Sequence, residues 1–195
     1  MAKQNNKQMG QCRIISGRWR GRKLPVPDLD GLRPTPDRVR ETIFNWLQPV
    51  IGSARCLDLF SGSGALGFEA ASRGAESVIL VEFNTTAAKQ LRDNKALLAA
   101  ENCNVENMTA QQFLATHSEQ YDIVFIDPPY QANLWTEIAQ QLVETSALRD
   151  NAHIYLECPS KGELPKLPNH WQLIKDKKAG EVRYCLFLNN VGDDT

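Results

Sequence analysis

The sequence lacks the features that mark secreted, disulfide-linked and membrane-spanning proteins. Its 195 residues include five cysteines, an odd number with no Cys-x-x-Cys pair, so neither a disulfide framework nor a zinc site is indicated. The apolar runs, such as 96–100 and 123–126, fall far short of the roughly 18 residues that a membrane span needs. Residues 1–10 are polar and contain no apolar signal core. These absences predict a soluble cytoplasmic protein with reduced thiols and without a metal.

Net charge is also nearly absent, but its distribution is uneven. The 22 Lys and Arg residues against 23 Asp and Glu residues give a formal charge of −1. Residues 1–40 hold ten basic and three acidic residues, whereas residues 41–195 hold 12 and 20. This asymmetry predicts a basic N-terminal arm that binds an acidic partner. The 42% of apolar residues suffices for one folded core and excludes intrinsic disorder.

Strand and helix patterns alternate after the arm, which predicts βαβ units and a doubly wound, mostly parallel sheet. The expected strands are 55–60, 77–82, 104–108, 121–127 and 153–158, and the expected helices are 64–73, 86–100, 111–115 and 134–145. Apolar segments at 171–175 and 181–188 predict an antiparallel hairpin at one sheet edge. Near the N-terminus, residues 12–24 predict a short hairpin, and Thr35 and Pro36 predict the start of a helix that ends at Pro49.

A glycine-rich loop follows the first strand of this α/β region and opens a helix. Gly62, Gly64 and Gly67 form the pattern Gly-x-Gly-x-x-Gly, and Glu82 lies 20 residues after Gly62, where a carboxylate can accept hydrogen bonds from ribose hydroxyls. The pattern alone fits a dinucleotide, adenosylmethionine, or a turn that uses glycine only for geometry. Asp58 favours adenosylmethionine, because its charge opposes a pyrophosphate but suits an ammonium group.

No carboxylate stands after the third strand, where an acid that binds adenine is expected. The sequence there reads Asn-Met-Thr-Ala-Gln-Gln from residue 107. Met108 is therefore predicted to pack on the adenine face, with the adenine amine meeting Asn107, Gln111 or a backbone carbonyl. Phe60, Gly62 and Gly64 complete the predicted cofactor-binding set with Asp58, Glu82 and Met108.

The tetrapeptide Asp127-Pro128-Pro129-Tyr130 follows a buried-strand run, so it is expected at the same sheet edge as the glycine loop. Its chemistry suits methylation of an exocyclic amine on a planar base. The Asp127 carboxylate and the Pro128 carbonyl can accept the two amine protons, and Tyr130 can stack on the ring. A plain turn at the strand end is the alternative interpretation, and the co-occurring glycine loop and Glu82 argue against it.

These motifs resemble class I, Rossmann-like methyltransferases, and the whole chain resembles a narrower group. Arg13–Leu24, Leu32–Glu41, Leu57–Gly67 and Asp127–Tyr130 are similar to the RsmD family, over about residues 12–188. The resemblance implies adenosylmethionine as methyl donor, and as acceptor the exocyclic N2 of one guanine in 16S rRNA, within an assembling or assembled small ribosomal subunit. It divides the chain into a flexible tail (1–10), a basic arm with a helix (11–50) and a methyltransferase domain (51–195).

The arm supports an RNA partner independently of this resemblance, because residues 10–24 contain no acid. Cationic side chains suit phosphate contacts, and Trp19 can stack on an unpaired base. The alternative is a solvated basic edge with Trp19 as a core residue of the hairpin. The predicted RNA-binding residues are Arg13, Arg18, Trp19, Arg20, Arg22 and Lys23.

Three other functions compete with this hypothesis. A DNA adenine-N6 methyltransferase shares the tetrapeptide but usually needs a larger recognition domain. An NAD-dependent oxidoreductase conflicts with Asp58 and the tetrapeptide. A non-catalytic RNA-binding module leaves both intact motifs without a role. The sequence indicates no obligate protein partner and leaves the oligomeric state open.

Overall fold

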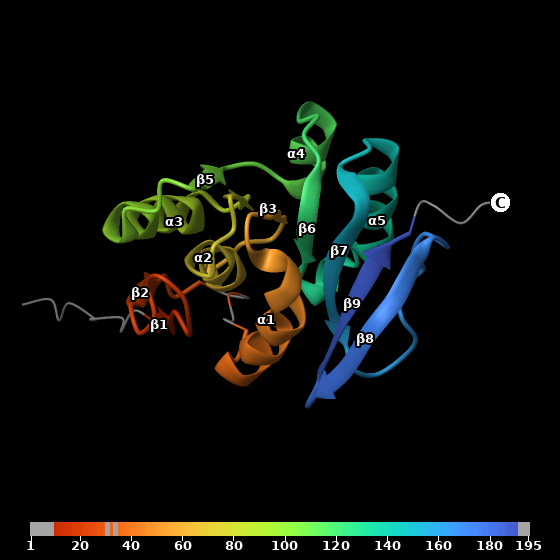
Figure 1. Cartoon of the computed structure of the whole chain (residues 1–195), viewed down its shortest axis with the longest axis horizontal. Coiled ribbons are helices and arrows are strands. Elements are labelled where there is room, and N and C mark those ends of the chain that lie inside the picture. The colour runs from red at the N-terminus through yellow and green to blue at the C-terminus, as the bar shows by residue number, and fades with distance from the viewer. Residues whose placement is uncertain (1–9, 30–31, 33–34, 191–195) are drawn as a thin grey trace, which may run out of the picture.

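A seven-stranded sheet forms the centre of the computed structural model, which describes residues 10–29, 32 and 35–190 (Figure 1). The strand order is β5-β4-β3-β6-β7-β9-β8, with a separate two-stranded hairpin of β1 and β2. The strands are β1 Gly10–Arg13, β2 Lys23–Val26, β3 Arg55–Asp58, β4 Ser77–Val81, β5 Cys103–Glu106, β6 Tyr121–Ile126, β7 Leu148–Pro159, β8 Trp171–Ala179 and β9 Val182–Asn189. The helices are α1 Asp37–Ile51, α2 Ala65–Ser72, α3 Thr85–Leu98, α4 Ala110–Thr116, α5 Trp135–Glu144 and the 3-10 turn η1 Tyr130–Ala132.

The predicted fold class is confirmed. Strands β3 to β7 pair in parallel, and β9 joins β7 antiparallel with β8 at the edge, as the C-terminal hairpin prediction required. The predicted N-terminal hairpin is also present, with Cys12 opposite Leu24. Of the tail predicted for residues 1–10, all but Gly10 lies outside the described residues, and Gly10 begins β1.

Some predicted helix and strand boundaries were wrong. The N-cap of α1 is Pro36, where Thr35 was predicted. Helix α1 begins at Asp37 after Pro36 and continues through Pro49 to Ile51, so Pro49 does not end it. Proline removes one hydrogen bond there, and the buried Ile51 side chain, 1% exposed, keeps the last turn packed on the core. Strand β7 begins at Leu148 instead of residue 153, because Leu148 already pairs with Tyr121 of β6, and the pairing resumes at His153 after an irregularity.

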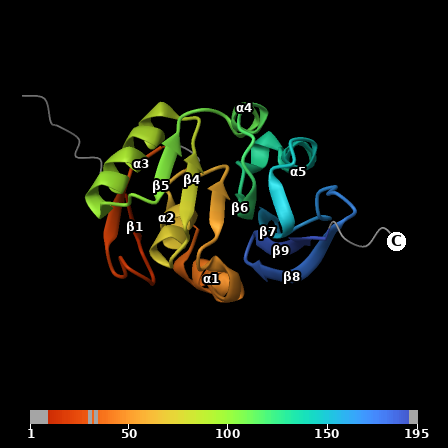
Figure 2. The same ribbon diagram turned by 45° about the horizontal axis from the view of Figure 1, so that its top comes forward.

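Helices cover both faces of the sheet, as the rotated view shows (Figure 2). Alternate strand residues point to opposite faces, so Ile123 packs with α1, α2 and α3 while Val124 packs with α4 and α5. The hairpin belongs to the first of these cores, because Ile14, Trp19 and Leu24 are buried in it. The arm is therefore packed against the α/β part of the chain, with a shared core.

Glu69 fastens the arm to this domain. It is fully buried in α2 and accepts hydrogen bonds from the backbone N–H groups of Ile15 (2.8 Å) and Ser16 (3.0 Å). Arg73 Nε donates to it at 2.7 Å, and Arg40 Nη1 lies 3.6 Å away. One carboxylate thus satisfies two arm donors and pairs two cations.

Close contact between the arm and α2 also requires glycine at position 17. Gly17 has a φ of +83°, and a Cβ atom there would lie 1.9 Å from the Ser72 carbonyl oxygen. The next residue, Arg18, donates its backbone N–H to that same oxygen at 2.8 Å. The turn of the hairpin therefore rests directly on the end of α2.

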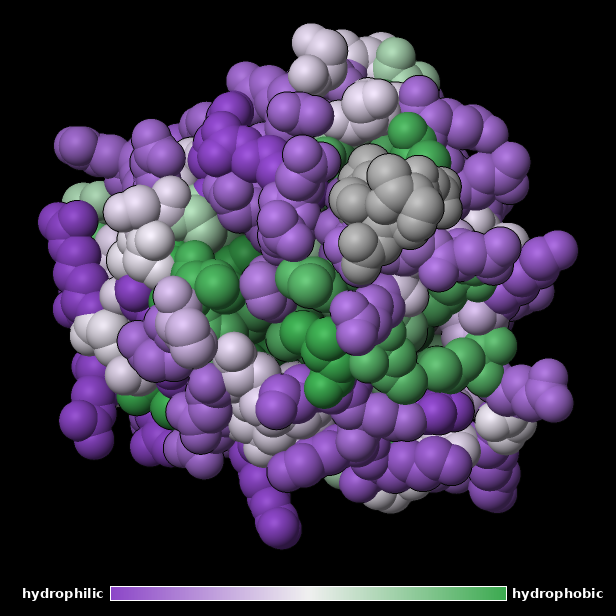
Figure 3. Space-filling view, turned by 45° about the vertical axis from the view of Figure 1, so that its right-hand side comes forward, coloured by the Kyte–Doolittle hydropathy of each residue, from purple (hydrophilic) through white to green (hydrophobic). Residues whose placement is uncertain are grey.

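The surface over the C-terminal strands shows some clustered apolar residues (Figure 3). Leu173 and Ile174 of β8 and Val143 of α5 are among the large exposed apolar side chains. No helix among the described residues is long and apolar enough to cross a membrane.

Replacing Glu69 tests its role as the fastening group. Glu69→Ala leaves Arg73 without its ion pair and two backbone donors unsatisfied, while Arg40 keeps its ion pair with Asp37, so we expect the free energy of unfolding to fall by about 3 to 5 kcal/mol. The measurement is urea unfolding followed by circular dichroism. Glu76→Ala, which removes an exposed acid after the same helix, should stay within about 0.5 kcal/mol of the wild type. Equal losses in both variants would contradict this role.

Candidate active site

The sequence-predicted functional acids meet at the carboxyl edge of the parallel strands. The chain runs outward from β3 to β4 and β5, then returns to β6 and β7 on the other side of β3. The strand order therefore reverses between β3 and β6, which is where open α/β sheets bind ligands. Asp58 ends β3, Glu82 follows β4 and Asp127 follows β6, so all three stand at this edge.

The glycine loop makes a tight turn from β3 into α2. Gly62 and Gly64 have φ values of +50° and +78°, and Gly64 is the N-cap residue of α2. A Cβ atom at Gly64 would lie 2.6 Å from the Phe68 ring. A Cβ atom at Gly67 would lie 2.7 Å from Leu80, so glycine there lets the helix approach β4 closely.

Asp58 is held beneath this loop. It is 2% exposed, and its Oδ2 accepts the backbone N–H of Gly67 at 3.1 Å. Burial raises the pKa of Asp58 to about 7, a backbone hydrogen bond from Gly67 opposes this shift, and the Glu82 charge adds to it. A buried acid that no Lys or Arg of the described residues pairs with is typical of a ligand-binding site, because a cationic ligand stabilises its charged form.

Glu82 organises the loop itself. Its Oε2 accepts the Gly62 N–H at 2.9 Å and its Oε1 accepts the Asn84 N–H at 2.8 Å. Each carboxylate oxygen has a second lone pair, so the predicted ribose contact stays available. Above the loop, Leu32 contacts Gly62 closely enough that a Cβ atom would lie 2.9 Å from its Cδ1.

The predicted adenine contacts are only partly free. The Asn107 side-chain amide donates to the backbone carbonyls of Glu82 (2.8 Å) and Phe83 (3.0 Å), so its N–H groups are occupied. Met108 and Phe60 are both partly buried and pack against the same core cluster. Phe83, which the sequence prediction did not include, is 63% exposed beside Glu82. In the sequence, the available signal was an aromatic residue directly after Glu82.

The tetrapeptide forms a rigid corner at the end of β6. Pro129 precedes η1 with a φ of −54°, and its carbonyl accepts the Ala132 N–H at 2.9 Å. Asp127 is partly buried and has no hydrogen-bond partner among the described residues. Burial, together with the charges of Glu157 and Asp58, raises the pKa of Asp127 well above its ordinary value. The Tyr130 ring is 37% exposed and lies 5.9 Å from the Trp135 ring, centroid to centroid.

Glu157 on β7 is a site residue that sequence analysis did not identify. It is 8% exposed, its Oε1 accepts the Tyr130 hydroxyl at 3.2 Å, and its Oε2 accepts the Tyr155 hydroxyl at 3.0 Å. Its backbone carbonyl accepts Trp135 Nε1 at 2.7 Å. Burial raises the pKa of Glu157, while the two phenol hydrogen bonds oppose that shift. No sequence pattern marks this acid, since it lies inside a strand and outside any motif.

The structure corrects the predicted role of Trp19. Its side chain is 5% exposed and sits in the core shared with α1 and α2, so it is not available to stack on a base. Its backbone N–H donates to Ser72 Oγ at 3.0 Å. The apolar indole is buried where the hairpin meets α2, which is the alternative that the sequence left open.

The arm cations are exposed but are spread between the two edges of the sheet. Arg18 bonds the end of α2 through its backbone, and Arg22 Nη2 donates to the Leu97 carbonyl near the end of α3 at 3.0 Å. Both helices run from the carboxyl edge back to the amino edge, so these arginines lie away from Asp127. Arg13 instead pairs with Asp37 at the start of α1 (3.3 Å), and Lys23 is its strand partner. Arg20 is exposed at the hairpin turn.

No group of three or more His, Cys, Asp or Glu side chains within the described ranges is arranged to hold a metal ion. All five cysteines are free and buried. The candidate site therefore consists of glycine-loop backbone, carboxylates and aromatic rings.

Fold and site together define an adenosylmethionine-dependent methyltransferase of the Rossmann-like class. A protein-family model described as "Conserved hypothetical protein 95" matches residues 12–188, and the chain belongs to this family. It is 50% identical over 187 residues to "Ribosomal RNA small subunit methyltransferase D" of Escherichia coli (strain K12), covering 96% of this chain and 94% of the relative. The Haemophilus influenzae protein of the same name is 46% identical over 184 residues, covering 92% and 95%.

A solved structure agrees with these sequence comparisons. The yhhF protein of Escherichia coli superposes with a TM-score of 0.88 and 48% identity, over 94% of this chain and 100% of that one. The resemblance to the RsmD family is thereby confirmed over nearly the whole chain. The comparisons support an enzyme that transfers methyl groups over the alternative interpretations of an oxidoreductase and of a non-catalytic RNA-binding module.

Substitution of Asp58 by asparagine is predicted to raise the stability of the folded protein and to weaken donor binding. Because its folded pKa of about 7 lies above its ordinary 3.8, the native state holds a proton more tightly, and stability contributed by Asp58 is lost as pH rises from about 4 to 7. Asp58→Asn removes this loss. At pH 8 we expect the variant to be more stable to urea by up to about 4 kcal/mol, with little difference at pH 4.

The same substitution should weaken the binding of S-adenosylhomocysteine, which carries the same ammonium group as the donor. Wild-type affinity measured by calorimetry should rise between pH 5.5 and 7.5 as Asp58 ionises, and the Asp58→Asn profile should be flat over that range. Parallel pH profiles for the two proteins would contradict a contact between Asp58 and the ammonium group.

Proposed function

We propose that this enzyme methylates the exocyclic N2 amine of a specific guanine in 16S rRNA, within an assembling or assembled small ribosomal subunit in the cytoplasm. The observation that carries the proposal is the placement of Asp127 and Tyr130 beside the donor loop, at the switch point of the sheet. The names of the relatives support rRNA of the small subunit as the substrate.

The donor half of the site fits adenosylmethionine by its chemistry. When bound, this donor supplies an electrophilic methyl group on a positively charged sulfur. Asp58 suits the ammonium group, Glu82 suits the ribose hydroxyls, and the glycine loop lets the backbone come close to the ligand. Met108, Phe60 and the exposed Phe83 offer apolar surface for adenine.

The acceptor half activates a weak nucleophile. The lone pair of the guanine amine is delocalised into the ring, so the amine must be polarised before it reacts. Asp127 and the Pro128 carbonyl accept its two protons, which directs the lone pair toward the methyl carbon. The nitrogen–carbon bond forms as the carbon–sulfur bond breaks, and Asp127 takes the proton that the nitrogen then loses. Tyr130 stacks on the base, which must leave its helical stack to reach the site.

Substitution of Asp127 tests this assignment. Asp127→Asn keeps the shape of the side chain but loses the charge that accepts the amine proton, so kcat should fall by at least about 100-fold. The assay follows labelled methyl transfer from adenosylmethionine to small subunits from a strain that lacks the enzyme. S-adenosylhomocysteine should bind the variant as it binds the wild type. Asp150→Asn, at an exposed acid on β7, is the matched control and should leave kcat unchanged.

Full activity of Asp127→Asn would remove Asp127 from the mechanism. Wild-type enzyme that labels DNA and leaves the small subunit unlabelled would instead favour the alternative of a DNA adenine-N6 methyltransferase.

We infer that RNA contacts the protein on more than the N-terminal arm. The exposed Arg13, Arg18, Arg20, Arg22 and Lys23 remain proposed phosphate contacts, although Arg18 and Arg22 lie toward the amino edge of the sheet. The β8–β9 hairpin offers a second basic surface at the acceptor edge. In the strand register Glu157 is opposite Tyr184, which is opposite Lys177, and Lys178 is one residue further.

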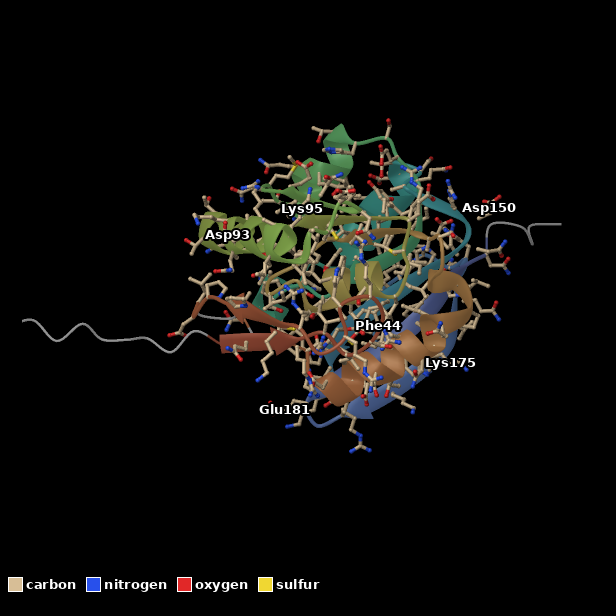
Figure 4. All side chains as sticks on the ribbon, turned by 60° about the vertical axis from the view of Figure 1, so that its left-hand side comes forward. Phe44, Asp93, Lys95, Asp150, Lys175 and Glu181 are labelled. Carbon is tan, nitrogen blue, oxygen red and sulfur yellow. The ribbon has the colours of Figure 1, made fainter. Side chains whose placement is uncertain are left out.

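These lysines extend from a hairpin that packs beside α1. Lys177 Nζ lies 6.0 Å from the centroid of the Trp46 ring, which stacks on Tyr184 at 5.5 Å. Figure 4 labels Lys175 along this hairpin and Glu181 at its turn. Asp176, the acid among these lysines, is paired with Arg183, so its charge is largely offset.

Paired charge reversals separate the two surfaces. Lys177→Glu with Lys178→Glu should weaken binding to small-subunit rRNA and make its dependence on salt concentration shallower, by a slope change of about one per lost phosphate contact. Arg18→Glu with Arg20→Glu should do the same only if the RNA also reaches the amino edge. Binding is measured by filter retention between about 50 and 200 mM salt. If a pair of substitutions leaves both the affinity for rRNA and the salt slope unchanged, the surface that carries those residues does not contact the RNA.

A further inference from the structure

The pairing of β6 and β7 places a second carboxylate beside the catalytic one. Ile126 of β6 is opposite Leu156 of β7, so Asp127 and Glu157 each follow one residue after a paired position. Neighbouring strands lie about 4.8 Å apart, and the Glu157 charge acts on Asp127 directly. The edge that receives the base therefore presents two acids side by side.

Glu157 is unusual for a buried acid, because no Lys or Arg of the described residues pairs with it. The Glu157 carboxylate accepts hydrogen bonds from the phenol hydroxyls of Tyr130 and Tyr155. A buried carboxylate without a cation costs free energy, and a neutral amide would accept the Tyr130 hydrogen bond at lower cost. Fixing the Tyr130 ring alone therefore does not account for an acid at this position.

Two adjacent hydrogen-bond acceptors match the edge of guanine. Guanine carries two neighbouring donors there, the N1–H and the N2 amine, whereas adenine carries an amine beside N1, which is an acceptor. A carboxylate attracts the guanine N1–H and repels the adenine N1 lone pair. Each Glu157 oxygen accepts one phenol and keeps one lone pair, so it can accept a further hydrogen bond.

We infer that Glu157 accepts the N1–H of the target guanine while Asp127 accepts its N2 amine, and that Glu157 thereby selects guanine over adenine. This inference rests on the proposed function and assigns the specificity of the same site. Tyr130 and Tyr155 hold the Glu157 carboxylate in place, and Tyr130 also supplies the stacking surface. A site built to pair with a donor rejects a base that lacks it, because its own buried group is then left unpaired.

The test replaces the mapped target guanine in a synthetic rRNA fragment, or in subunits reconstituted with it, by 2-aminopurine. This base keeps the exocyclic 2-amine but carries a lone pair at N1 in place of N1–H. Wild-type enzyme should show kcat/KM about 10- to 100-fold higher for guanine than for 2-aminopurine. In Glu157→Gln the carboxylate acceptor of the guanine N1–H is lost and an amide N–H can donate to the N1 of 2-aminopurine, so the preference should shrink to near unity through a loss on guanine and a gain on 2-aminopurine.

The control is Tyr155→Phe, which removes the hydroxyl that holds Glu157 Oε2 but leaves the acid in place. It should lower activity modestly while keeping the preference for guanine. The loss of O6 in 2-aminopurine affects all three proteins alike, so comparing their preferences isolates the contact at N1. Binding of S-adenosylhomocysteine by each variant checks that the donor half is intact.

Two results would overturn the inference. Equal kcat/KM values of the wild-type enzyme for guanine and for 2-aminopurine would exclude a contact at N1, regardless of the results for the variants. Glu157→Gln that loses activity on both bases by the same factor reduces Glu157 to a positioning residue for Tyr130. Failure of the proposed function is distinct from either, since the wild type would then methylate no guanine in the RNA.

Discussion

The carboxylates concentrated at one edge of the sheet govern how this structure is built and what it can bind. Asp58, Asp127 and Glu157 are buried or partly buried near one another, and no Lys or Arg in the described part of the chain pairs with them. Burial raises the pKa of all three carboxyl groups, and repulsion from Glu157 and Asp58 raises that of Asp127 further. A donor with a cationic sulfur and an ammonium group stabilises the ionised forms of these carboxylates. The unfavourable electrostatic free energy of the free enzyme is thereby relieved when the donor binds, which increases the affinity for the donor.

The rest of the fold keeps these acids in place. The parallel order of the strands brings Asp58 and Asp127 to the switch point, and the glycine loop lets α2 approach β4 above Asp58. On the other side of α2, Glu69 binds the arm through backbone N–H groups and arginines. The arm thus contributes to the core beneath the site, and its exposed cations are additional to that structural role.

Sequence patterns were sufficient where local chemistry decides the structure. The alternation of apolar runs and helical stretches predicted the order of strands and helices, and the glycine loop and tetrapeptide predicted which residues meet. Trp19 was placed wrongly, because hydropathy and charge along the chain cannot show that α2 covers the turn of the hairpin. Glu157 could not be found at all, since its importance comes from the register between β6 and β7.

The identity of the methylated nucleoside decides between guanine-N2 and adenine-N6 methylation. Small subunits from a strain lacking the enzyme are incubated with the purified protein and labelled adenosylmethionine, and their rRNA is digested to nucleosides for mass spectrometry. The two-acceptor site predicts that the label is recovered as N2-methylguanosine, at about one per subunit, given a single target. Label recovered as N6-methyladenosine would contradict this account.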